Sequence, residues 1–148
     1  MAGVAAYRFS CQLNENAKYP AVPGAVPEAT HNQIVTFDGP FAGRGEYADD
    51  LPQDQADDVP ATPRLRLVLL RDPNEHPRAR RRCQVSRDIA AQRGVPVSEV
   101  AAVGSSRLER LASLVGLTDY ASVYLALLYD VDPTPVAAIE DVKQRIGR

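Results

Sequence analysis

Residues 65–72 read LRLVLLRD, with an unbroken apolar run in the middle. Leucine and valine without a polar interruption are typical of a strand covered on both faces, as in a parallel sheet. A helix is predicted over 77–93, with Pro77 at its start and Gly94 after its end, and a second strand over 97–104, VSEVAAVG. A strand, a helix and a strand in this order predict a parallel pair joined by a helical crossover.

The sequence after this second strand predicts helices only. One is expected over 105–117, where apolar residues form a single stripe, and Thr118 is expected to cap a second helix over 120–129. The stripe consists of Leu108, Leu111, Ala112 and Val115. The second helix, YASVYLALLY, is apolar on nearly all sides and is therefore expected to be buried. A last helix is predicted over 135–146.

The sequence before residue 65 is less regular. Apolar residues at three- and four-residue spacings predict a helix over 3–18, and IVTF at 34–37 predicts a short third strand. The acidic, proline-containing stretch 43–63 is expected to form a mobile loop. We therefore expect a single α/β domain over 1–148, in which helices flank a small, mostly parallel sheet in three layers. A sheet of three strands leaves both edges open, so it looks truncated on its N-terminal side.

Composition excludes several classes of protein. Hydrophobic residues make up 45% of the chain and charged residues 24%, which fits neither a disordered nor a fibrous protein. A net charge of -2 does not favour nucleic-acid binding. No apolar run reaches the length of a membrane helix and no signal peptide is recognised, so we expect a cytosolic protein with no membrane partner. Cys11 and Cys83 are expected to be reduced, packed thiols, and no metal site is expected.

Residues 12–33, QLNENAKYPAVPGAVPEATHNQ, carry many polar side chains between two apolar segments. Glu15 is expected near the end of the first helix, where the helix dipole disfavours a carboxylate. His31 stands in a proline-broken loop, from which an imidazole can reach into a cleft. A carboxylate and an imidazole across one pocket suit proton transfer next to a carbonyl group. The alternative is a surface glutamate and an exposed loop histidine without a function.

Five segments in a fixed order resemble the C-terminal half of the bifunctional phosphoglucose/phosphomannose isomerases, which are built from two sugar isomerase (SIS) domains. The segments are LNENAKYP, THNQIVTF, LVLLRDPNEHPRARRR, GVPVSEVAAVGSSRLERLASL and DYASVYLALLYDVDPTPVAAIEDVKQR. The resemblance runs from about residue 4 to the end, without the acidic stretch. It implies a SIS-type, flavodoxin-like fold and the interconversion of aldose and ketose 6-phosphates without a metal or redox cofactor.

The resemblance also implies which residues act. Glu15 matches the base that moves a proton between C1 and C2 of the sugar phosphate. His31 matches a histidine that assists opening of the sugar ring and reaches the site from the neighbouring subunit. Lys143 is the only candidate for a lysine that lines the site near the C-terminus.

Further residues are expected to contact the substrate. Thr134 matches a region whose threonine is associated with tolerance of both glucose and mannose configurations, and a plain N-cap before Pro135 is the alternative. Asn14 and Asn32, next to the two proposed catalytic residues, are also assigned to substrate binding.

The resemblance implies a preceding SIS domain, whose Ser/Thr-rich loops hold the substrate phosphate. No stretch of these 148 residues resembles such a domain, and Gln33 stands where the family usually has glutamate. We therefore expect a homodimer or a separate chain that supplies an N-terminal SIS domain. A noncatalytic SIS-like domain that binds a sugar phosphate or assembles with another subunit is the alternative function.

Two other motifs favour structural interpretations. The arginines of RARRRCQVSR are expected on a solvated helix face rather than on bound phosphate or nucleic acid. In GSSRLE, Ser106 and Glu109 fit a capping box better than an anion site.

Overall fold

The computed structural model describes residues 1–42 and 65–147, and the predicted acidic loop 43–63 lies outside the described residues. Two compact units are present. The helical unit comprises residues 1–23 and 103–148, and the sheet unit comprises residues 24–102. The predicted single-domain organisation stays a prediction.

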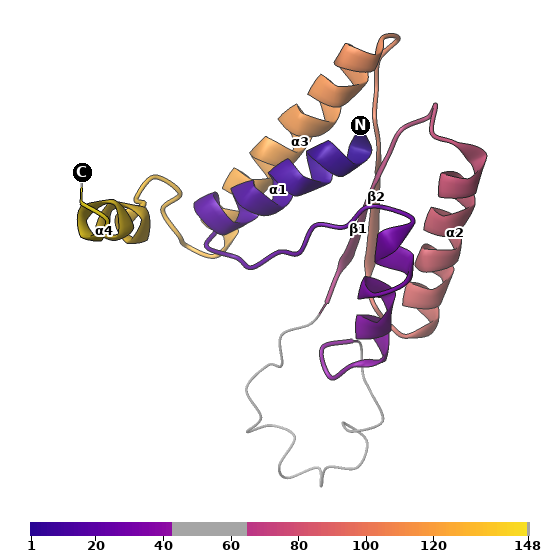
Figure 1. Cartoon of the computed structure of the whole chain (residues 1–148), viewed down its shortest axis with the longest axis horizontal. Helices are drawn as coiled ribbons and strands as arrows, with labels where there is room; N and C mark the ends of the chain where they lie inside the picture. Colours follow the sequence, from indigo (N-terminus) through magenta and orange to yellow (C-terminus); the bar gives the residue numbers. More distant parts are fainter. Residues whose placement is uncertain (43–64, 148) are drawn as a thin grey trace, which may run out of the picture. The chain divides into compact units, whose positions relative to one another are not determined.

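The helical unit contains α1 (Ala2–Asn16), α3 (Arg107–Leu128) and α4 (Ala137–Arg145). Helices α1 and α3 lie side by side (Figure 1). The residues of α3 that are buried recur every fourth position, as expected where the ridge formed by such residues packs into a neighbouring helix. They are Arg110, Leu114, Thr118, Ser122 and Ala126. The pairing is reinforced by Arg8 of α1, whose Nη2 donates to Oδ2 of Asp119 at 2.7 Å.

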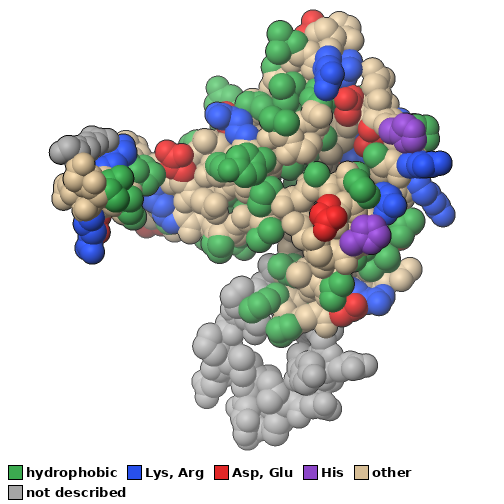
Figure 2. Space-filling model, viewed as in Figure 1, with side chains coloured by type: hydrophobic (Ala, Val, Ile, Leu, Met, Phe, Trp, Pro, Cys, Tyr) green, Lys and Arg blue, Asp and Glu red, His purple; other side chains and the backbone are tan. Residues whose placement is uncertain are grey.

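Helix α3 corrects the prediction of two helices. It runs unbroken for 22 residues, because Thr118 does not cap a new helix. Instead, Oγ1 of Thr118 donates to the carbonyl oxygen of Leu114 at 2.9 Å, one turn back in the same helix. The expected burial of 120–129 is also wrong. Leu108, Tyr120 and Leu128 are 75%, 70% and 82% exposed, and hydrophobic side chains lie open at the surface (Figure 2).

Among the described residues, α3 alone is long and apolar enough to cross a membrane, with a mean hydropathy of 1.5 over an 18-residue window. This corrects the expectation that no stretch reaches that length. Helices in the cores of soluble proteins pass the same test. The buried residues of α3 include the polar Arg110, Thr118 and Ser122, which fits a helix packed against protein.

The sheet unit confirms the predicted parallel pair. Strands β1 (Leu67–Arg71) and β2 (Val97–Ala101) are parallel and in register from Leu67 opposite Val97 to Arg71 opposite Ala101. Helix α2 (Pro77–Gln92) connects them, and Nδ1 of His76 accepts a hydrogen bond from the backbone N–H of Arg78 at the start of this helix. The core packs side chains of β1, α2 and β2 around Phe37, Ala90 and Val95.

The third predicted strand is absent from the described residues. IVTF belongs to a 3-10 helix, η2 (Gln33–Asp38), which follows another short one, η1 (Glu28–Thr30). Asn32 Oδ1 accepts from the backbone N–H of Gln33 at 2.6 Å, and Thr36 Oγ1 donates to the carbonyl oxygen of Gln33 at 2.7 Å. These local side-chain bonds offer the backbone an alternative to a strand ladder, and they outweigh the strand preference of isoleucine and valine.

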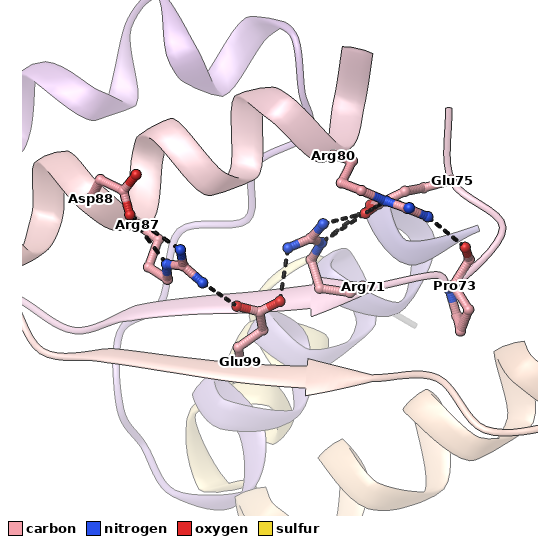
Figure 3. A network of polar contacts seen from close by, with 7 residues as sticks. All are labelled: Arg71, Pro73, Glu75, Arg80, Arg87, Asp88 and Glu99. Atoms are coloured by element: carbon pink, nitrogen blue, oxygen red, sulfur yellow. Dashed lines mark hydrogen bonds and ion pairs between the residues drawn. The ribbon is translucent and has the colours of Figure 1, made fainter. Parts of the chain in front are cut away.

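A network of charged side chains joins both strands to α2 (Figure 3). At the end of β1, Arg71 is 8% exposed. Its Nε donates to Oε1 and Oε2 of Glu75 at 3.0 and 3.2 Å, and its Nη1 donates to Oε1 of Glu99 at 2.7 Å. Arg80 lies 3.6 Å from Glu75, and Arg87 lies 3.8 Å from Glu99. The hydrogen bond to Glu75 is the main cause of a raised pKa of Arg71, so the guanidinium stays charged.

Both cysteines are free thiols. Cys83 of α2 is buried, as predicted, and burial raises the pKa of its thiol, which keeps it protonated and unreactive. Cys11 of α1 is exposed, so the expectation of a packed thiol is wrong there.

Candidate functional site

The C-terminal end of α1 presents Glu15 to solvent. Glu15 is exposed in the last turn of the helix. Within residues 1–42 and 65–147, its carboxylate makes no hydrogen bond or ion pair. This carboxylate is carried by an ordered helix and stabilises no other described group, so it is available for chemistry.

The polar side chains on both sides of Glu15 make hydrogen bonds that fix the end of the helix. Asn14 Oδ1 accepts from the backbone N–H of Ala21 at 3.1 Å, which folds the departing chain back over the helix end. Asn16 Nδ2 donates to Ser122 Oγ of α3 at 2.8 Å, and Ala17 is only 4% exposed. The turn that carries Glu15 is therefore fixed to α3 on one side and to the following segment on the other.

The same turn reaches the segment between α3 and α4. Lys18 Nζ donates to the carbonyl oxygen of Glu15 at 2.6 Å and to that of Pro135 at 2.9 Å. The rings of Tyr19 and Tyr129 stack with centroids 5.7 Å apart and planes 3° from parallel. Pro135 directly follows Thr134, so Lys18 links the backbone of Glu15 to the residue next to Thr134. Sequence reasoning missed the part played by Lys18.

Thr134 lies in a turn ordered by Asp132. Asp132 Oδ1 accepts from the backbone N–H of Thr134 at 2.9 Å. This bond, a side-chain bond from Thr134 and a weaker attraction by Lys18 lower the pKa of Asp132. The alternative that Thr134 caps the last helix is wrong, because α4 begins at Ala137 and its N-cap is Val136. A shallow pocket of about 320 Å³ adjoins the turn; it is lined by Leu127, Asp130, Val131, Asp132 and Pro133.

His31 and Asn32 belong to the sheet unit, where both are exposed. Both histidines of the chain lie at the surface in Figure 2. Asn32 is engaged locally at both ends of its amide: Oδ1 accepts from Gln33 N–H, and Nδ2 donates to Glu28 Oε1 at 2.9 Å. Beside them, Thr30 Oγ1 accepts from Arg82 Nη1 at 2.9 Å, which ties the loop to α2.

Lys143 is exposed in the last turn of α4. Within the described ranges its ammonium group has no hydrogen bond or ion pair with a side chain. A cation in the last turn suits the negative end of the helix dipole. Lys143 is in the same unit as Glu15, whereas His31 is in the other.

The loop between β2 and α3 has the form of an anion site, but the chain fills it itself. Oε2 of Glu109 accepts from Ser105 N–H at 2.7 Å, from Ser105 Oγ at 2.7 Å and from Ser106 N–H at 3.0 Å. Ser106 Oγ accepts from Glu109 N–H in return, so the predicted capping box is confirmed. Gly104 has a φ of +138°, and a Cβ there would lie 2.5 Å from Glu109 Cβ, so the loop requires glycine.

The Glu109 cap predicts a specific pH dependence of stability. The hydrogen bonds from Ser106 and Ser105 lower the pKa of Glu109 from 4.5 to about 2. A carboxyl group with a lowered folded-state pKa stabilises the fold above its unfolded-state pKa, and this contribution is lost as pH falls toward 2. Unfolding free energies measured by urea titration should therefore fall less steeply between pH 4.5 and 2 in Glu109→Gln than in the wild type. Equal slopes in the two proteins would contradict this assignment.

No group of three or more histidine, cysteine, aspartate or glutamate residues lies close enough to hold a metal ion in the described ranges. At the end of α1 the described side chains offer the Glu15 carboxylate, a group that can transfer protons, and the ammonium group of Lys18 beside its backbone.

The comparisons with known proteins agree on one family. The model of the bacterial phospho-glucose isomerase C-terminal SIS domain matches residues 1–146. The chain is 33% identical over 144 residues to the bifunctional phosphoglucose/phosphomannose isomerase of Caldicellulosiruptor bescii, covering 97% of this chain and 37% of that protein. It is 31% identical over 143 residues to the protein of the same name from Aquifex aeolicus, covering 97% of this chain and 39% of that protein.

The chain thus spans little more than a third of the length of the curated relatives that it matches. The match covers almost all of the chain, and the parallel α/β arrangement fits the SIS-type fold. The chain belongs to the family of bacterial phospho-glucose isomerase C-terminal SIS domains.

Proposed function

We propose that this chain supplies the proton-transfer half of an aldose-ketose isomerase, which interconverts glucose 6-phosphate or mannose 6-phosphate with fructose 6-phosphate. Membership of the family and the names of the relatives support this reaction class. The observation that carries the proposal is the presentation of Glu15: its neighbours are all engaged in holding the turn, and its own carboxylate is not.

In the proposed reaction, Glu15 takes the proton from C2 of the open-chain aldose, which gives an enediolate across C1 and C2. The same group returns the proton to C1 while the proton of the C2 hydroxyl group passes to the C1 oxygen, so the carbonyl group is left at C2 of the ketose. A positioned carboxylate is an efficient base for this step. Lys143 stabilises the negative charge of the enediolate. Thr134 and Asn14, which are in the same unit as Glu15, are proposed to contact the sugar. Asn32 is proposed to contact it together with His31, from the sheet unit of the neighbouring subunit.

His31 is proposed to assist ring opening by moving a proton between the ring oxygen and the C1 hydroxyl. It is in the sheet unit, whereas Glu15 is in the helical unit. We propose that His31 enters the site from a neighbouring subunit of a homodimer. Exposed apolar side chains on α1 and α3, such as Val4 and Tyr124 at 65% and 63% exposure, support an assembled state.

The substrate phosphate is proposed to be held outside this chain. The one described loop with the form of an anion site, at Ser105 and Ser106, is filled by the carboxylate of Glu109. The relatives have more than half of their length beyond the matched region. We propose that an additional SIS domain, on the same or another polypeptide, binds the phosphate. The substrate is a charged, water-soluble ester, so a cytosolic location is proposed as well.

An isomerase assay tests the proposal. Fructose 6-phosphate is supplied to the chain alone and to the chain mixed with the non-matching remainder of the Caldicellulosiruptor bescii relative. Glucose 6-phosphate is measured with a coupled dehydrogenase, and mannose 6-phosphate is measured separately. We expect activity only in the mixture. No activity in the mixture, when nuclear magnetic resonance shows that both parts are folded and associated, would overturn the proposal.

A noncatalytic domain that binds a sugar phosphate or assembles with a subunit is the second candidate. The occupied loop at Ser105 favours its subunit-assembly form, because the described residues then offer no loop that would orient a substrate phosphate for catalysis. It predicts binding of fructose 6-phosphate or of the partner in calorimetry, with no turnover in any mixture.

A further inference from the structure

Lys18 has a backbone conformation that is unusual for a lysine at the end of a helix. Helix α1 ends at Asn16 with Ala17 as its C-cap, and Lys18 follows with a φ of 53°. This left-handed conformation is the one for which glycine is normally selected after a helix, because a side chain there is strained. A residue that keeps a long side chain in this position does so against local preference, which is typical of functional sites.

The ammonium group of Lys18 explains the departure. Nζ turns back to the carbonyl oxygen of Glu15 at 2.6 Å and also reaches that of Pro135 at 2.9 Å, 117 positions away in the sequence. Hydrogen bonds from a charged donor are stronger than those between neutral groups. One side chain therefore joins the turn that carries Glu15 to the turn that carries Thr134.

A second contact joins the same two segments. Tyr19, the residue after Lys18, stacks on Tyr129 at the end of α3. The contacts are made by the successive residues Lys18 and Tyr19. Their partners, Pro135 and Tyr129, flank the turn from 130 to 134. We call this pair of contacts the Lys18 clamp.

We propose that Lys18 is a positioning residue, which holds the 130–135 turn against the end of α1 so that Glu15 and Thr134 keep a fixed separation. The inference rests on the proposed isomerase function and adds to it a residue that acts without touching the substrate. Glu15 must reach carbon-bound protons while Thr134 contacts the same sugar, so a loosened turn impairs both tasks. A displacement of about 1 Å in such a site costs on the order of a hundredfold in rate.

The test compares Lys18→Met, Lys18→Arg and Tyr129→Leu in the assembled, active protein. In Lys18→Met we expect kcat to fall about ten- to a hundredfold and KM to rise, because orientation and substrate contact are lost together. Lys18→Arg keeps a charged donor and should restore most of both parameters. Tyr129→Leu should show a smaller change in the same direction. A loss of folded protein alone would lower the apparent kcat at unchanged KM.

Hydrogen exchange supplies a readout that does not depend on activity. The backbone N–H groups of Val131 and Thr134 donate to Ala126 O and Asp132 Oδ1, so both are protected in the clamped turn. In the chain itself, Lys18→Met should speed their exchange about tenfold, as expected for loss of a charge-assisted hydrogen bond. Arg107→Met, which removes an exposed charge from the start of α3, is the control and should leave these rates unchanged.

The outcomes separate the two proposals. Wild-type exchange and wild-type kinetics in Lys18→Met, with Glu15→Gln inactive, would overturn the clamp and leave the isomerase function standing. Faster exchange without any isomerase activity in the wild-type assembly would overturn the function and the positioning role of Lys18 with it. Faster exchange together with a lower kcat, a higher KM and rescue by Lys18→Arg supports both.

Discussion

Replacing Glu15 with glutamine should lower kcat by about 10² to 10⁴ in an assembly with isomerase activity, the usual contribution of a positioned general base. Glutamine has nearly the same shape as glutamate but cannot accept a proton at neutral pH. The carboxylate makes no hydrogen bond or ion pair within the described ranges, so the substitution leaves no described partner unsatisfied. KM should therefore change little, and the loss should lie in kcat.

Glu140→Gln is the matched control for this substitution. Glu140 is also an exposed glutamate of the helical unit, in the first turn of α4, and no role in the reaction is proposed for it. Its kcat should stay within about twofold of wild type, as for an ordinary surface substitution. A kcat within a few fold of wild type in Glu15→Gln would remove Glu15 from the mechanism. Exchange of solvent deuterium into C1 of fructose 6-phosphate should be lost in step with turnover.

The elements with the clearest local signals were predictable from the sequence. The apolar run of β1, the proline that opens α2 and the capping box of α3 each depend on neighbouring residues, and each is confirmed. Two elements were not predictable in this way. Thr118 can cap a helix or bond back within one, and in the fold it is buried and bonds back to Leu114. IVTF has strand propensity, but bonds from Asn32 and Thr36 favour a 3-10 helix.

The candidate site, too, was predictable from the sequence only in part. Glu15 and Thr134 were found by resemblance, and the segments that carry them are linked by contacts between distant parts of the chain. The polar neighbours of Glu15 looked like donors for a substrate, yet Asn14 and Asn16 are engaged in holding the turn. Lys18 was missed, because neither its left-handed conformation nor its reach to Pro135 is visible in a local pattern.

Replacing Arg71 with methionine should lower the free energy of unfolding by about 3 kcal/mol, the low end of the range for breaking a buried ion pair. Methionine fills most of the space but leaves Glu75, whose side chain is 13% exposed, without its closest partner. Glu99 is 37% exposed and keeps Arg87 at 3.8 Å, so solvent and a second cation reduce the cost there. Urea titration of the wild type and the variant measures the difference.

The size of this loss depends more on the largely buried Glu75 carboxylate, which keeps only the more distant Arg80 at 3.6 Å, than on the value of the Arg71–Glu75 ion pair itself. Arg71→Met combined with Glu75→Leu should therefore recover a large part of the stability, because the double variant buries no isolated charge. Arg81→Met, an exposed arginine of the same helix as Arg80, should change stability by less than about 0.5 kcal/mol. A double variant less stable than Arg71→Met alone would contradict this prediction. It would mean that the attraction between the charges of the network in Figure 3 exceeds the free-energy cost of removing them from water.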